Sequence, residues 1–164
     1  MQEQAAVLVL VGERQWTWDV LHNACVVARQ RGGRVVLMQM VRVQHIAHLG
    51  AVVGCAPPDE YDLADLQAYA DTAADYGLDY DVQTYQYYDA FGAIAEASSQ
   101  AGASVVFARL PASIIPFWSE CRFEVLRQRL AHQGIELHDR PVQADAMYDQ
   151  PVKGSRLPRA VESV

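Results

Sequence analysis

The residues best suited to ligand chemistry surround one connecting segment, VVFARLPASIIPFWSECRFEVL, which spans 105–126. The segment begins like a buried strand and ends like an amphipathic helix. Connections of this kind often carry glycines where they bind phosphate, because phosphate oxygens need several converging backbone N–H groups. This chain has no glycine between Gly102 and Gly134, and Pro111 and Pro116 have no N–H to donate. The segment therefore lacks the donor set of a phosphate loop.

Two polar residues of this segment are candidates for an anion all the same. Arg109 has the charge to meet a phosphate, although a surface cation at the end of a strand is the simpler interpretation. Ser119 has a suitable hydroxyl, although a helix N-cap is again simpler. The neighbouring side chains are apolar, and a phosphate among them would be costly to desolvate. They are Ile114, Ile115, Phe117 and Trp118.

Catalytic groups are few near the predicted strand ends: Glu13, Arg109 and, from a long connection, His45 or His48. No nucleophile elbow or P-loop accompanies them. The two histidines have no cysteine or carboxylate at ligand spacing, so no metal site is predicted. An enzymatic function would rest on fold alone, so we assign no catalytic residue and favour a non-enzymatic role.

Composition sets further limits on function. The chain has 164 residues, the size of one domain, and a net charge of −7. That charge argues against binding to nucleic acid or to anionic membranes. The N-terminus MQEQ has no basic region, and no apolar run is long enough to span a bilayer, so we expect a soluble cytoplasmic protein. The three cysteines have neither metal nor redox spacing, and Cys25 is expected to be a small core residue.

Apolar runs and helical patterns alternate along the chain. Strands are predicted at 5–11, 34–41, 79–87, 104–108 and 135–139, the third of them at an edge. Helices are predicted from Arg14 or Thr17 to Gly32-Gly33, from 59 to about 76, from Asp89 to 100, and over 119–133. The expected inward stripes are Trp16, Val20, Ala24 and Val27; Leu63, Leu66, Ala70 and Ala73; and Phe123, Leu126 and Leu130.

This alternation predicts an α/β fold with a mainly parallel sheet, helices on both faces and right-handed crossovers. Ligands bind such sheets at the carboxyl ends of the strands, next to the switch point. The positions there are Gly12 and Glu13 after the first strand, Val41 after the second, and 108–119 after the fourth.

Three segments, VLVLVGE, GGRVVLMQMV and YYDAFGAIAEASSQAGASVVFA, give residues 5–139 a resemblance to a universal stress protein domain. The resemblance implies a doubly wound five-stranded parallel sheet with strand order 3-2-1-4-5. This is a Rossmann-like fold of the adenine nucleotide alpha hydrolase-like type. It also implies one domain over 1–139, followed by a tail over 140–164 that is either disordered or bound to a partner.

The departures from the family pattern bear on function. Nucleotide-binding members usually carry an aspartate after the first strand, where this chain has Gly12, and glycines after the fourth strand, which are missing here. The resemblance therefore implies a regulatory, partner-binding protein without nucleotide hydrolysis or cofactor, acting as a homodimer in a stress response. The alternative is a diverged member that binds ATP or another nucleotide through Gly12, Val41, Arg109 and Ser119.

Two interpretations of the apolar segment remain open. In one, Ile114, Phe117 and Trp118 fold back and fill the cleft that nucleotide occupies in other members. In the other, they face outward with Ile115 and form a partner-binding patch, in which tryptophan and phenylalanine would be the anchors.

Overall fold

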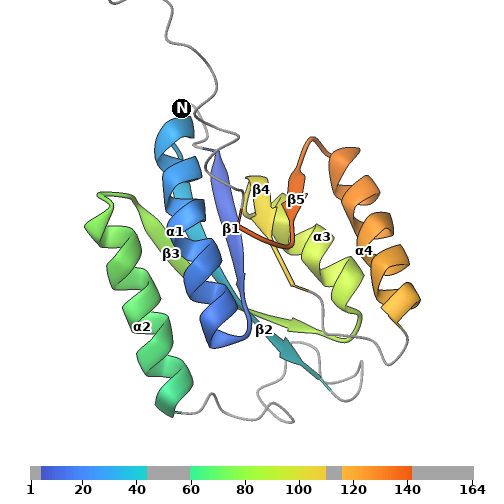
Figure 1. Ribbon diagram of the computed structural model, residues 1–164, viewed down its shortest axis with the longest axis horizontal. Coiled ribbons are helices and arrows are strands. Elements are labelled where there is room, and N and C mark those ends of the chain that lie inside the picture. The colour runs from blue at the N-terminus through green and yellow to red at the C-terminus, as the bar shows by residue number, and fades with distance from the viewer. Residues whose placement is uncertain (1–4, 44–59, 110–115, 142–164) are drawn as a thin grey trace, which may run out of the picture.

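A computed structural model describes residues 5–43, 60–109 and 116–141, with 60–62 and 116–119 described by their backbone alone. Five strands alternate with four helices in this part of the chain (Figure 1). The strands are β1 (Ala6–Val11), β2 (Arg34–Arg42), β3 (Tyr80–Tyr87), β4 (Ala103–Phe107) and β5 (Glu136–His138). The helices are α1 (Arg14–Arg31), α2 (Glu60–Asp75), α3 (Ala90–Gln100) and α4 (Pro116–Ala131).

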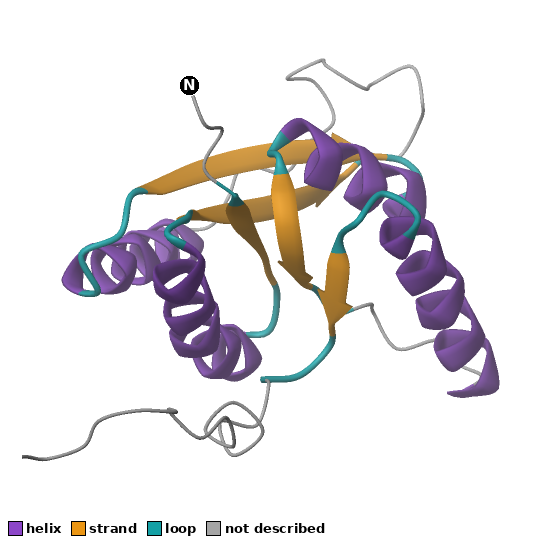
Figure 2. Ribbon diagram, turned by 90° about the horizontal axis from the view of Figure 1, so that it is seen from above, coloured by secondary structure: helices purple, strands orange, loops and turns teal. Residues whose placement is uncertain are grey.

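The sheet is parallel throughout, in the order β3-β2-β1-β4-β5, which confirms the predicted fold class and strand order. Because β1 is central, its side chains alternate between two cores. Val7 and Val9 pack with α1 and α2, whereas Leu8 and Leu10 pack with α3 and α4. Figure 2 shows the two pairs of helices separated by the twisted sheet. No described helix is long and apolar enough to cross a membrane.

Helix α1 follows its predicted pattern. Its apolar stripe is buried at Trp16, Val20, Ala24 and Val27. Cys25 is also buried, as expected, and burial raises the pKa of its thiol to about 11. The helix ends at Gly32, whose φ of 62° is left-handed, and the N–H of Gly33 donates to the Ala28 carbonyl at 2.8 Å. Gly33 is needed for a different reason, since a Cβ there would lie 1.9 Å from the carbonyl oxygen of Ala5.

Two predictions for the other helices were wrong in detail. Leu63 is 53% exposed, whereas the buried face of α2 consists of Leu66, Tyr69, Ala70 and Ala73. At 100° per residue, Leu63 lies about 70° around the helix from the centre of that face. Helix α4 begins at Pro116 and not at Ser119. A proline in the first turn suits a helix, because its fixed φ is helical and its missing N–H would have no intrahelical partner.

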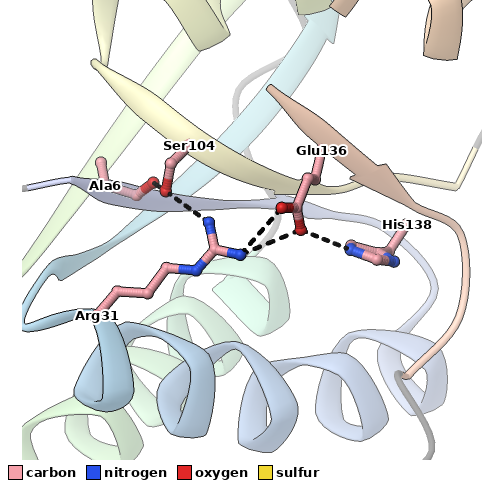
Figure 3. Close-up of polar contacts among 5 residues, drawn as sticks. All are labelled: Ala6, Arg31, Ser104, Glu136 and His138. Carbon is pink, nitrogen blue, oxygen red and sulfur yellow. Dashed lines mark hydrogen bonds and ion pairs between the residues drawn. The ribbon is translucent and has the colours of Figure 1, made fainter. Parts of the chain in front are cut away.

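A polar network joins the end of α1 to strands β4 and β5 (Figure 3). The Arg31 guanidinium donates to both carboxylate oxygens of Glu136 at 3.1 Å and to the Ser104 hydroxyl at 3.3 Å. Ser104 in turn donates to the Ala6 carbonyl at 3.5 Å, and Nε2 of His138 lies 3.7 Å from Glu136. The register of β1 on β4 shifts just after Ala6, beside this network.

Candidate functional site

The switch point of the sheet lies between β1 and β4, because α1 leaves β1 on one face and α4 leaves β4 on the other. Gly12 and Glu13 follow β1, and Arg109 follows β4. Two of the predicted nucleotide-contacting positions, Gly12 and Arg109, are therefore brought to the same edge. Val41 is at the end of β2, two residues beyond Gln39, which pairs with the last residue of β1.

An ion pair bridges the loops that follow β1 and β4. Nη1 of Arg109 lies 3.0 Å from a carboxylate oxygen of Glu13. Both side chains are more than half exposed, so the pair contributes at most about 1 kcal/mol to stability. The ion pair matters more for ligand binding than for stability. Arg109 is the one cation that follows β4 at this edge in the described part of the chain, and its guanidinium is already paired with the Glu13 carboxylate. The sequence placed both groups at the strand ends, and the structure shows that they meet.

The N–H of Gly12 also has a hydrogen-bond partner within the chain. It donates to the Thr17 hydroxyl at 3.1 Å, and that hydroxyl donates to the Glu13 carbonyl at 2.9 Å. Thr17 is fully buried, so this hydroxyl connects the end of β1 to the first turn of α1 out of contact with water. An anion at this point would therefore compete with an existing hydrogen bond for the N–H of Gly12.

Trp16 links the first turn of α1 to the residue that follows β5. Its indole N–H donates to the Asp139 carbonyl at 2.9 Å, and its ring lies 3.7 Å from where a Cβ on Gly12 would be. The sequence pattern identified Trp16 only as a core residue of α1 and did not reveal this contact. The signal that could have indicated this contact is the presence of a tryptophan in the first turn of the helix that follows β1.

The remaining predicted site residues are not brought together by what the structure describes. Ser119, Phe117 and Trp118 belong to the first turn of α4, where the backbone alone is described. Ile114, Ile115, His45 and His48 lie outside the described residues. The plugged and outward interpretations of the apolar segment therefore both stay predictions. No cluster of three potential metal-binding side chains occurs within the described ranges.

An apolar depression of about 280 Å³ lies on the outer side of α3 and α4. Phe91, Cys121, Arg122 and Val125 line it. The guanidinium carbon of Arg122 stands 4.4 Å from the centre of the Phe91 ring, and Val125 is 63% exposed. The depression was not predicted, because it depends on how α3 and α4 pack, which the sequence pattern does not give. Cys121 follows Trp118 by three residues, so the depression adjoins the first turn of α4.

Comparison with known proteins gives a structural match without a sequence match. No protein-family model matches the chain, and no curated protein matches it. A universal stress protein family member from Burkholderia pseudomallei superimposes with a TM-score of 0.59 at 16% identity, covering 87% of this chain and 99% of its own. A universal stress protein in complex with cAMP gives 0.53 at 13% identity, with 84% and 97% covered. One from Archaeoglobus fulgidus gives 0.52 at 12%, with 81% and 90% covered.

The parallel order β3-β2-β1-β4-β5 with helices on both faces defines a doubly wound, Rossmann-like α/β protein. Within that class the chain has the fold of the universal stress proteins, with nearly the full length of each of the three neighbours covered. At identities of 12–16% the likeness shows the fold alone.

Proposed function

We propose that this chain is a universal stress protein-like regulatory protein that binds a protein partner, acts as a homodimer in a stress response, and does not hydrolyse nucleotide. One observation carries the proposal. The two groups at the switch point best suited to a phosphate, the N–H of Gly12 and the guanidinium of Arg109, are bonded to Thr17 and Glu13. A phosphate would have to displace both contacts, in a site whose following segment has no glycine.

The proposed partner surface comprises Ile114, Ile115, Phe117 and Trp118. The exposed apolar depression beside Cys121 and Val125 supports this choice, because it would extend such a surface along α4. Solvent-exposed apolar surface with aromatic anchors is typical of protein interfaces.

Trp118→Ala tests this surface. If Trp118 is an anchor, the variant loses binding to the partner or to a second copy while its thermal unfolding stays within about 1 kcal/mol of the parent. If Trp118 fills the former nucleotide cleft, the variant loses about 3–5 kcal/mol of stability. Tyr80→Ala is the control, since Tyr80 is an exposed aromatic residue at the start of β3, the opposite end of the parallel sheet from the segment that follows β4. An unchanged variant in both assays would contradict the proposed role of the segment.

Nucleotide binding is the second candidate, and the neighbour in complex with cAMP favours it. It would use Gly12, Val41, Arg109 and Ser119, with Arg109 exchanging Glu13 for phosphate. The test is thermal unfolding of nucleotide-free protein with Mg-ATP, AMP and cAMP. A ligand at a hundred times its Kd adds about 2.7 kcal/mol, or about 5–10 °C in a domain of this size. We expect no shift at millimolar concentrations. A shift that Arg109→Gln abolishes would establish the nucleotide site instead.

A further inference from the structure

The depression on the outer side of α3 and α4 combines apolar surface with one positive charge. These two helices lie side by side on one face of the sheet (Figure 1). Phe91 contributes to the depression from the first turn of α3, and Cys121, Arg122 and Val125 contribute from one side of α4. Cys121 and Val125 are both exposed. A hollow lined mainly by apolar side chains, with one polar group among them, has the usual composition of a small-molecule site.

The charge of Arg122 is held in place by an aromatic ring. Its guanidinium carbon lies 4.4 Å from the centre of the Phe91 ring, a distance at which a cation and a ring attract each other. Among the described residues no carboxylate pairs with Arg122, since the nearby Glu124 pairs with Arg127 at 2.7 Å. A guanidinium held in this way keeps N–H groups at its edge that can bind a carboxylate through two parallel hydrogen bonds.

The volume of the depression limits the size of a ligand. It measures about 280 Å³, whereas sites for drug-sized ligands begin near about 300 Å³. A dry cavity of about 150 Å³ is large enough for benzene, so the depression has room for one aromatic ring with a short side chain, or for a chain of about eight carbons. The ligand is therefore a small molecule with one apolar part.

We propose that this depression binds a small amphipathic carboxylate, with its carboxylate on Arg122 and its apolar chain or ring against Phe91 and Val125. The apolar part would remove exposed hydrocarbon surface from water. The carboxylate would supply the partner that Arg122 lacks among the described residues. The site is separate from the switch point of the sheet. The inference goes beyond the proposed function, and it depends neither on the homodimer nor on a protein partner.

Cys121 gives a local readout of binding, because a ligand in the depression would cover its thiol. The experiment measures the rate at which N-ethylmaleimide alkylates Cys121 in the full chain, resolved by peptide mass spectrometry, over a concentration series of octanoate. Octanamide is the matched neutral probe, since it has the same chain and no charge. Octanoate should slow the alkylation at least about fivefold at saturation. Octanamide should need at least about a tenfold higher concentration for the same effect.

Two glutamine variants each remove one positive charge from α4. Arg122→Gln should abolish the preference for octanoate over octanamide, because the carboxylate loses its partner. Arg129→Gln should keep the preference, since Arg129 lies about two turns further along the helix and does not line the depression. Arg122→Lys keeps the charge without the paired N–H groups and should keep only part of the preference.

Each variant is compared with itself in the absence of ligand, because Arg122 also affects the reactivity of the neighbouring thiol. Circular dichroism confirms that each variant is folded.

Three outcomes would overturn the inference. Equal protection of Cys121 by both probes would show an apolar surface that does not select an anion. No protection by either probe at about 10 mM would show that the depression is not a ligand site. A loss of preference in Arg129→Gln as large as in Arg122→Gln would show that the general charge of α4, and not this guanidinium, attracts octanoate.

Discussion

Thr17 is the residue on which the local structure of the switch point most depends. Its buried hydroxyl accepts from Gly12 and donates to the carbonyl of Glu13, so one side chain pairs two backbone groups. Without it, the N–H at the end of β1 would be open to an anion. The residue therefore stabilises the fold and at the same time removes a phosphate donor.

Thr17→Val should destabilise the protein by about 1–3 kcal/mol. The valine has the shape of threonine but leaves the Gly12 N–H and its neighbouring carbonyl without this partner. Urea unfolding followed by circular dichroism measures the change, and Thr17→Ser, which keeps the hydroxyl, is the control. A valine variant as stable as the serine variant would show that the hydrogen bonds to Thr17 do not contribute.

At this scale the sequence predicted positions better than contacts. Gly12, Glu13 and Arg109 could be placed at one edge because strand ends are visible in the apolar pattern. The pairing of Arg109 with Glu13 and the bond from Trp16 to Asp139 could not be predicted. Both depend on how β4 and β5 align with β1, which residues far apart in the chain decide.

Among the elements, α3 shows how a local signal predicts a boundary. Asp89 precedes the helix, as predicted, and a carboxylate oxygen accepts from the N–H of Gly92 at 2.9 Å. The start of α4, which was predicted mainly from its apolar side-chain pattern, was less accurate. Helix α4 begins three residues before Ser119, because Pro116 starts helices as readily as it interrupts strands.

Asp89→Ala should cost about 0.5–2 kcal/mol of stability, because the first turn of α3 loses the acceptor for one of its N–H groups. Asp89→Asn keeps an acceptor at the same place and should cost clearly less. Chemical denaturation of the three proteins under the same conditions gives the comparison. Equal losses for alanine and asparagine would show that the charge matters and the cap does not.

Over the whole molecule, alternation of apolar runs and helical patterns was sufficient to predict the fold. It works because β1 and β2 are covered on both faces, so their sequences are apolar at nearly every position. Patterns of this kind do not encode what lies on the surface. The depression beside Arg122 therefore became apparent only in three dimensions.

The net charge of −7 sets the salt dependence of the proposed dimer. Two acidic copies repel each other, and this repulsion is strongest at low ionic strength. Raising the salt concentration from about 20 mM to about 200 mM should therefore lower the dimer Kd, since it shortens the screening length. Sedimentation equilibrium at the two concentrations measures it. A dimer that weakens with salt would instead be held by ion pairs between copies.

The paired glycines after α1 bear on which sequences can share this fold. Gly32 has a left-handed backbone with open space around it, and asparagine tolerates that conformation at modest cost. Gly33 has no such freedom, since any side chain would collide with the carbonyl oxygen of Ala5 at the start of the central strand. In a saturation library selected for folding, position 32 should accept a few residues and position 33 none. Distant relatives with this fold are therefore expected to vary at the position of Gly32 and to keep glycine at the position of Gly33.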